Sequence, residues 1–284
     1  MSDFAYHRAR YLDEAVALLN EPGVRSRILA GGTDLVNQFR GGSVTHDRIV
    51  DVAHVPELRV IEVNGRVTVG AAVTHTEIVE NVDLQESAPL LVKACQQIGS
   101  PQIRNIATIG GNVVNAAACA DTLPALVCLD AEAIIVTQTG ECRLAVSDFV
   151  TGVNRTRLPE GGLVRGFTFE LPPANSRSSF QRIGRRQAMA IARLSVAVMG
   201  ALDKVGIISF VRVVPGAAFS RFRRIEAVEK ILIGRKPTPD LFASAGAGMA
   251  DQFLAESGGR WSAPYKTQAI AVLTERALEE VLGS

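Results

Sequence analysis

The chain has 284 residues, of which 47% are hydrophobic and 21% charged, so it can form one large or two ordinary globular domains. Lysine plus arginine (30) nearly balance aspartate plus glutamate (29), and the formal net charge is +1. This balance excludes the strong positive field that is typical of proteins binding nucleic acid or a membrane surface.

The beginning of the chain and its cysteines favour a cytoplasmic protein. Residues 1–8 contain no apolar signal core, and no apolar run reaches the roughly 18 residues that a membrane span requires. The cysteines follow no metal-binding spacing and are expected to be reduced and buried; they are Cys95, Cys119, Cys128 and Cys142. The histidines form no ligand pair either, so no metal site is predicted.

The first part of the chain alternates between short strands and helices. Apolar residues at helical spacing predict helices, and alternating or β-branched runs predict strands. The predicted strands are residues 4–8, 26–30, 48–52, 58–63, 66–71, 133–138, 141–146 and 163–171. The predicted helices are residues 12–19, 35–39, 76–98 with a break at 83–89, and 122–129. Asn64 and Gly65 favour a hairpin with a type I′ turn.

A small, polar segment at residues 174–179 is the best candidate for a domain boundary. Beyond it, alternation predicts strands at residues 180–186, 194–202 and 207–214, followed by helices at 225–233, 240–254 and 265–282. This order indicates an antiparallel sheet with a helical layer. We therefore predict an α+β protein with domains at residues 1–175 and 176–284.

Two glycine motifs stand out in the first domain. The first glycine motif (residues 28–35) consists of Ile28, Leu29, Ala30, Gly31, Gly32, Thr33, Asp34 and Leu35. The second glycine motif (residues 107–114) consists of Ala107, Thr108, Ile109, Gly110, Gly111, Asn112, Val113 and Val114. Successive N–H groups in such turns can hold an anion, and glycine lets a ligand approach the backbone. One motif alone is more typical of a structural turn, but two together favour a dinucleotide pyrophosphate.

Within the first motif, Thr33 or Asp34 can cap the predicted helix that follows. Asp121 has two compatible interpretations, as a carboxylate that accepts hydrogen bonds from sugar hydroxyls and as the N-cap of the next helix. Residues 180–186 place Arg182 and Arg186 on one face of a strand, where they could meet a phosphate. The alternative is a solvated edge strand whose charges prevent aggregation.

No known catalytic motif appears in the sequence. It contains no G-x-S-x-G elbow, no Walker loop and no G-x-G-x-x-G fingerprint. No catalytic residue is therefore predicted. If the protein is an enzyme, a bound cofactor is expected to carry out the chemistry.

At the two glycine motifs the sequence resembles the FAD-binding (medium) subunit of the molybdenum hydroxylase family, which includes xanthine dehydrogenase. Residues 29–35 and 103–112 carry the resemblance, with Asp121 and Pro124 at the family spacing, and residues 180–186 and 265–266 also match. The resemblance implies a PCMH-type FAD-binding domain of two α+β subdomains, with the flavin between them, followed by a C-terminal α+β domain. Ile28 to Leu35 and Thr108 to Asn112 would then wrap the FAD. Asp121 would hold sugar hydroxyls, and Ser100, a residue near Phe167, and Arg182 would also contact the cofactor.

The resemblance also implies partners. A large subunit would carry molybdopterin and a small subunit two [2Fe-2S] clusters, forming a heterotrimer. The flavin would take electrons from these clusters and pass them to NAD or another acceptor. Three alternatives remain open: a flavin-free scaffold subunit, the flavin subunit of an aldehyde or carbon monoxide dehydrogenase, and a stand-alone flavin oxidase.

Overall fold

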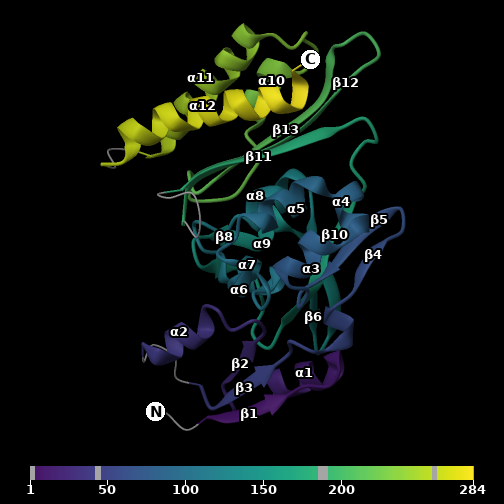
Figure 1. Ribbon diagram of the computed structural model, residues 1–284. Helices are drawn as coiled ribbons and strands as arrows, with labels where there is room; N and C mark the ends of the chain where they lie inside the picture. Colours follow the sequence, from purple (N-terminus) through teal and green to yellow (C-terminus); the bar gives the residue numbers. More distant parts are fainter. Residues whose placement is uncertain (1–3, 42–45, 185–190, 258–260, 284) are drawn as a thin grey trace.

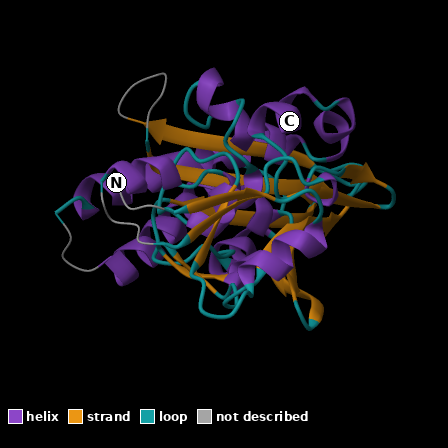
Figure 2. Cartoon of the chain, turned by 90° about the horizontal axis from the view of Figure 1, so that it is seen from below, coloured by secondary structure: helices purple, strands orange, loops and turns teal. Residues whose placement is uncertain are grey.

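Three β-sheets of three or more strands follow one another along the described chain, each with its own helices (Figure 1). The computed structural model describes residues 4–41, 46–184, 191–257 and 261–283. Seen from below, the strands run through the middle of the molecule and the helices lie around them (Figure 2). Arg185 and Arg186, part of the predicted strand 180–186, lie outside the described residues.

The N-terminal subdomain is a parallel sheet with the strand order β1-β3-β2. Parallel neighbours require crossover connections, and helices supply them between successive strands. The elements are β1 (Ala5–Arg8), α1 (Leu12–Leu19), β2 (Ser26–Leu29), α2 (Leu35–Arg40), β3 (Arg48–Asp51) and the 3-10 turn η1 (Pro56–Leu58). A small apolar cluster, which includes Val16, Val50 and Leu58, holds this subdomain together.

The central subdomain contains an antiparallel sheet with the order β4-β5-β10-β6-β7. Its strands are β4 (Ile61–Val63), β5 (Arg66–Gly70), β6 (Glu132–Thr137), β7 (Gly140–Ala145) and β10 (Leu163–Glu170), and a separate ribbon contains β8 (Val150–Gly152) and β9 (Arg155–Thr156). Both predicted hairpins are confirmed. The predicted type I′ turn is wrong, because it requires a positive φ at both central residues and only Gly65 has one.

Short helices cover this central sheet. They are α3 (His75–Glu80), α4 (Val82–Ser87), α5 (Pro89–Gln96), α6 (Pro101–Arg104), α7 (Ile109–Asn115), α8 (Thr122–Cys128) and α9 (Val146–Phe149). The predicted break at residues 83–89 is confirmed only at Ala88, because the rest of that segment up to Ser87 is helix α4. A further break lies at Asn81, whose side chain caps α4 by accepting a hydrogen bond from the N–H of Leu84 (2.9 Å).

The C-terminal domain is an antiparallel sheet with the order β11-β12-β13, as predicted. Its elements are β11 (Arg177–Gly184), β12 (Ala192–Leu202), β13 (Ile208–Gly216), α10 (Glu226–Leu232), α11 (Pro239–Ser257) and α12 (Ala263–Leu282). The helices lie on one face of this sheet (Figure 1). Alternate residues of β12 serve both faces: Val196 and Val198 pack with the helices, whereas Ala197 and Met199 join the core of the central subdomain.

The cysteines only partly follow the prediction. Cys95 and Cys128 are buried, and burial raises the pKa of both thiols, but Cys119 is half-buried and Cys142 is exposed on the edge strand β7. Across the described ranges, no helix is both long enough and apolar enough to cross a bilayer.

Candidate functional site

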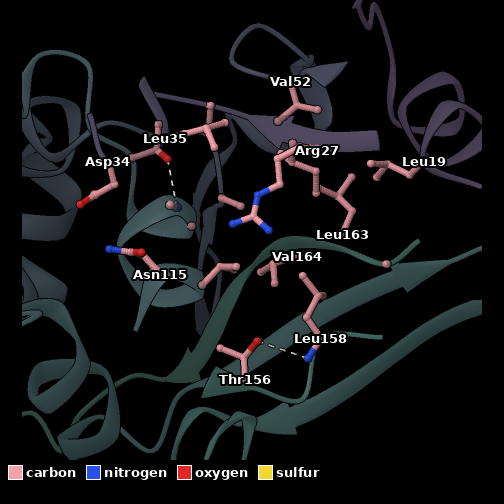
Figure 3. A pocket seen from close by; sticks show the side chains of 18 of the residues that line it. Leu19, Arg27, Asp34, Leu35, Val52, Asn115, Thr156, Leu158, Leu163 and Val164 are labelled. Carbon is pink, nitrogen blue, oxygen red and sulfur yellow. Dashed lines mark hydrogen bonds between the residues drawn. The ribbon is translucent and has the colours of Figure 1, made fainter. Parts of the chain in front are cut away.

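A large cavity lies between the N-terminal and central subdomains, with a volume of about 1480 Å³. Both glycine motifs form part of its wall. The other side is formed by residues that begin β10 and the segment before it, including Leu158, Leu163 and Val164 (Figure 3). The side chains of Asp34 and Asn115 lie around the same space (Figure 3).

The first glycine motif is an open turn between β2 and α2. Strand β2 ends at Leu29, Gly32 has a φ of +70°, and α2 begins at Leu35. The backbone N–H groups of the turn residues 31–34 donate no hydrogen bond to any described residue. Asp34 holds the N-cap position without a side-chain bond to the helix, so the predicted cap is not formed. This turn therefore keeps its donors available for an anion.

The second glycine motif is the beginning of helix α7 and not an open turn. The N–H of Gly110 donates to the carbonyl oxygen of Ala71 (2.9 Å), and the N–H of Gly111 donates to Oγ1 of Thr108 (3.1 Å). The N–H of Asn112 donates to the carbonyl oxygen of Thr108 (3.0 Å). The expectation that successive N–H groups here form an anion-binding concavity is therefore wrong, because the protein itself uses them.

Two of the glycines are required where the motifs pack against the rest of the protein. A Cβ on Gly31 would lie 2.0 Å from the carbonyl oxygen of Ile106, directly before the second motif. A Cβ on Gly110 would lie 2.5 Å from the Cβ of Ala71. Such contacts are too short for any side chain, so Gly31 lets the two motifs lie side by side, and Gly110 seats α7 on the segment that follows β5.

Packing within the described part of the chain does not require a glycine at position 111. Its φ is not positive, and, apart from its chain neighbours and its own helix backbone, the only described atom that an added Cβ would meet within 4 Å is Oγ1 of Thr108, at 3.1 Å. The residue is exposed and lies on the cavity wall. A side chain here would occupy the space in which a ligand could approach the backbone.

Asp121 and Arg182 form a buried ion pair where the central subdomain meets the C-terminal domain. Nε of Arg182 lies 3.2 Å from Oδ2 of Asp121, and the two side chains are 11% and 4% exposed. Oδ1 of Asp121 has no hydrogen-bond partner among the described residues. Burial raises the pKa of Asp121 to about 7, against the opposite effect of the Arg182 guanidinium. A buried carboxylate oxygen without a donor fits a ligand hydroxyl.

Arg182 is not the solvated edge residue of the alternative interpretation. Its Nη1 donates to the carbonyl oxygen of Gln97 (2.9 Å), so it ties β11 to the end of α5. Asp121 holds the N-cap position of α8 without a side-chain bond to the helix. Burial raises the pKa of the Cys119 thiol, the charges of Asp121 and Asp34 raise it further, and the charge of Arg182 lowers it. Asp34 therefore also acts electrostatically on this region.

The cavity wall contains most, but not all, of the predicted cofactor-binding residues. It includes Ile28, Ala30, Gly31, Gly32, Thr33, Asp34, Leu35, Thr108, Gly110, Gly111 and Asn112. It does not include Leu29, Ser100, Ile109, Asp121, Phe167 and Arg182. Phe167 and Ile109 are fully buried in the apolar core, and the Ser100 side chain accepts a bond from the N–H of Ile103 (3.4 Å) as the cap of α6.

Among the wall residues that the sequence analysis did not predict, Arg27 and His75 carry the groups of greatest chemical interest. Arg27 projects from β2 into the cavity, and its guanidinium forms no hydrogen bond or ion pair with the described part of the chain (Figure 3). His75 also lines the cavity but is fully buried, and neither of its ring nitrogens has a partner among the described residues. Burial lowers the pKa of His75 to about 4, so the ring is neutral. A charged residue directly before a glycine motif was the available signal for Arg27, whereas His75 has none.

An open turn with available N–H donors, a helix that begins with two glycines and a large cavity between two subdomains are features of a site for a nucleotide cofactor. Comparison with known families gives the particular one. Residues 2–172 match the FAD binding domain in molybdopterin dehydrogenase, and residues 179–281 match the CO dehydrogenase flavoprotein C-terminal domain. The chain belongs to this family of FAD-binding subunits of molybdenum hydroxylases, which are oxidoreductases.

Individual relatives cover the whole chain. It is 31% identical to the glyceraldehyde dehydrogenase medium chain of Sulfolobus acidocaldarius, over 98% of both chains. It is 29% identical to the putative xanthine dehydrogenase FAD-binding subunit of Escherichia coli (strain K12), over 100% of this chain and 98% of that one. Among solved structures, a chain of the Cu,Mo-CO dehydrogenase matches with a TM-score of 0.90 and 26% identity, over 98% and 96% of the two chains.

Proposed function

We propose that this protein carries FAD in the cavity between its first two subdomains and transfers electrons through it. Gly111 is the observation that supports this most directly, because nothing within the described protein requires glycine there. The turn at residues 31–34 supplies unused N–H donors to the diphosphate. The bare backbone at Gly111 lets the cofactor lie against the second motif.

In this proposal Asp121, which is not one of the residues that line the cavity, is reached by the ribityl or ribose part of the cofactor and accepts hydrogen bonds from its hydroxyls. Its Oδ1 is buried and lacks a donor, and its partner Arg182 comes from the C-terminal domain. A hydroxyl donor on Oδ1 would satisfy the carboxylate and favour its ionised form. The residues of both domains would then contribute to holding the cofactor, with the division between domains near residues 175 and 176.

When bound, FAD would supply the acceptance and release of electrons, which none of the side chains described here can perform alone. The electrons would come from [2Fe-2S] clusters of a small subunit, after a large molybdopterin subunit oxidises the substrate. They would leave to NAD or another acceptor. The relatives named as medium chains favour such a three-part assembly, and we place it in the cytoplasm.

The substrate class proposed is that of xanthine dehydrogenase, which the relative at 29% identity favours. The second candidate is an aldehyde or carbon monoxide dehydrogenase, which the relatives at 31% and 28% identity favour. The substrate would lie on the large subunit, so residues of this chain do not separate the two.

The test is a visible spectrum of the complex purified through this chain, with molybdenum and iron analysis and mass identification of its partners. Flavin absorbance with both metals and two additional subunits is the expected result. Xanthine, glyceraldehyde and carbon monoxide are then added separately, and the one that bleaches the flavin identifies the class. A chain that stays colourless after incubation with FAD would contradict the proposal.

A further inference from the structure

Thr122 and Asn112 form a hydrogen bond that joins the second glycine motif to the beginning of helix α8. Oγ1 of Thr122 donates to Oδ1 of Asn112 at 2.5 Å. Thr122 is fully buried and directly follows Asp121, whereas Asn112 is half-buried and lines the cavity. The bond therefore links a residue of the cavity wall to a buried residue that is not part of that wall.

This bond decides which end of the Asn112 carboxamide remains available. A carboxamide has an acceptor oxygen and a donor nitrogen, and rotation of its last torsion exchanges them at little cost. Here the oxygen accepts from Thr122, and the nitrogen has no hydrogen-bond partner within the described ranges. The amide nitrogen of Asn112 is therefore the group that can donate a hydrogen bond to a ligand in the cavity.

The bond has no simpler purpose within α8. Thr122 opens that helix, but its hydroxyl does not cap it, because its bond goes to a side chain of another helix. Hydrogen bonds between two side chains make up only about a tenth of all hydrogen bonds within proteins, so this one calls for a specific explanation. A valine has nearly the same shape and would fill the same buried space without needing a partner. The hydroxyl is explained by what it does to Asn112.

We propose that Thr122 is a positioning residue for the cofactor. It holds Asn112 with its amide nitrogen free, so that the second motif donates a hydrogen bond to an oxygen of the ligand, either a phosphate or a carbonyl oxygen. This inference rests on the proposed binding of FAD. It also gives the second motif a side-chain donor where its backbone donors are already used.

The test measures FAD affinity of the full chain by flavin fluorescence, together with thermal unfolding of the FAD-free protein. Thr122→Val is expected to weaken FAD binding about tenfold, in line with the loss of one well-placed hydrogen bond. Thr122→Ser keeps the hydroxyl and is expected to bind like the wild type. Because Thr122 acts only through Asn112, the double variant Thr122→Val with Asn112→Ala is expected to bind no more weakly than Asn112→Ala alone.

The matched control is Thr274→Val in the C-terminal domain. Thr274 is also fully buried, and its Oγ1 donates to the carbonyl oxygen of Ile270 (2.8 Å), so its replacement reports loss of a buried hydroxyl far from the cavity. Its FAD affinity is expected to stay at the wild-type level.

Two results would overturn the inference: unchanged FAD affinity in Thr122→Val, or losses that simply add in the double variant. Failure of the wild-type chain to bind FAD would instead contradict the proposed function. A fall in the unfolding temperature of Thr122→Val with normal FAD affinity would show a purely structural role and reject positioning.

Discussion

The first glycine motif is an open turn after β2, whereas the second begins helix α7 and packs into the central subdomain. In the first, the N–H groups of residues 31–34 have no partner in the described chain. In the second, the N–H groups of Gly110, Gly111 and Asn112 are all hydrogen-bonded within the protein. Nearly identical patterns of sequence thus present different groups to the same cavity.

The difference indicates two modes of contact with one cofactor. The first motif is suited to donate hydrogen bonds from its backbone to negative charge. In the second motif, the cofactor can lie close to the backbone at Gly111, and Asn112 supplies a single side-chain donor. Gly31 connects the two, because its missing side chain lets the first turn lie against Ile106. Each mode can be removed separately by substitution.

Gly31→Val is expected to have the largest effect, because it separates the two motifs. Its Cβ would lie 2.0 Å from a backbone oxygen, which cannot move like the end of a side chain. Overpacking of this kind typically lowers the free energy of unfolding by about 1–3 kcal/mol. We expect a lower unfolding temperature and complete loss of FAD, measured by calorimetry and by flavin absorbance after gel filtration. Retention of both FAD and stability would show that the two motifs are not in contact.

Gly111→Val is expected to abolish FAD binding while leaving the fold intact. The added Cβ would have one close neighbour among the described residues outside its own helix backbone, Oγ1 of Thr108, and the position lies on the cavity wall. The unfolding free energy should change by less than about 1.5 kcal/mol, which covers the propensity of valine in a helix and the contact with Thr108. Flavin content and unfolding temperature are measured on the same sample.

Gly41→Val is the control for this substitution. Gly41 also lacks a positive φ, and the described atoms nearest to an added Cβ lie at ordinary distances of 3.5 and 3.6 Å. It does not line the cavity, so its FAD content should equal that of the wild type. Undiminished flavin in Gly111→Val would contradict the assignment of the second motif to the cofactor.

Local patterns predicted most elements of the fold, because helical and strand periodicity depends on neighbouring residues. The strand order β1-β3-β2 and the contact between Gly110 and Ala71 are long-range, and no local pattern specifies them. For the same reason the sequence identified both glycine motifs but not their different roles. Arg27 and Thr122 were missed because their importance depends on what lies opposite each of them in the folded chain.

Asp121 should make the affinity for FAD depend on pH. The pKa of Asp121 is about 7 in the protein without FAD. Below that pH its carboxyl group is mostly protonated, so a proton must be removed before the carboxylate can accept hydrogen bonds from the cofactor. FAD affinity is therefore expected to fall as the pH is lowered from 8 to 6, by at most tenfold per unit, and to level off above about 7. Asp121→Asn should bind more weakly at pH 8 and lose the slope, as followed by fluorescence titration.

The stability of the FAD-free protein should show the opposite trend. A carboxyl whose pKa is raised on folding binds its proton more tightly in the native state, so its contribution to the unfolding free energy declines as the pH rises from about 4 to about 7. Asp121→Asn removes this decline, whereas Asp83→Asn on the exposed side of α4 should preserve it. An unchanged pH slope in Asp121→Asn, for both binding and stability, would assign the titration to another group.

Arg27→Gln should have the smallest effect, because it changes the charge beside the first motif without altering its donors. The guanidinium points into the cavity and has no ion-pair partner in the described structure, but it is exposed, so solvent screens its attraction for a diphosphate. We expect FAD affinity to fall about threefold at low salt and the difference to vanish as ionic strength rises. The control is Arg235→Gln on the exposed surface of the C-terminal domain, which makes the same change in net charge at a position away from the cavity. Equal effects of the two variants would mean that the overall charge of the protein acts on the cofactor. An effect of Arg27→Gln alone would place the negative part of the ligand beside the first motif. The second motif would then act through its shape and through Asn112.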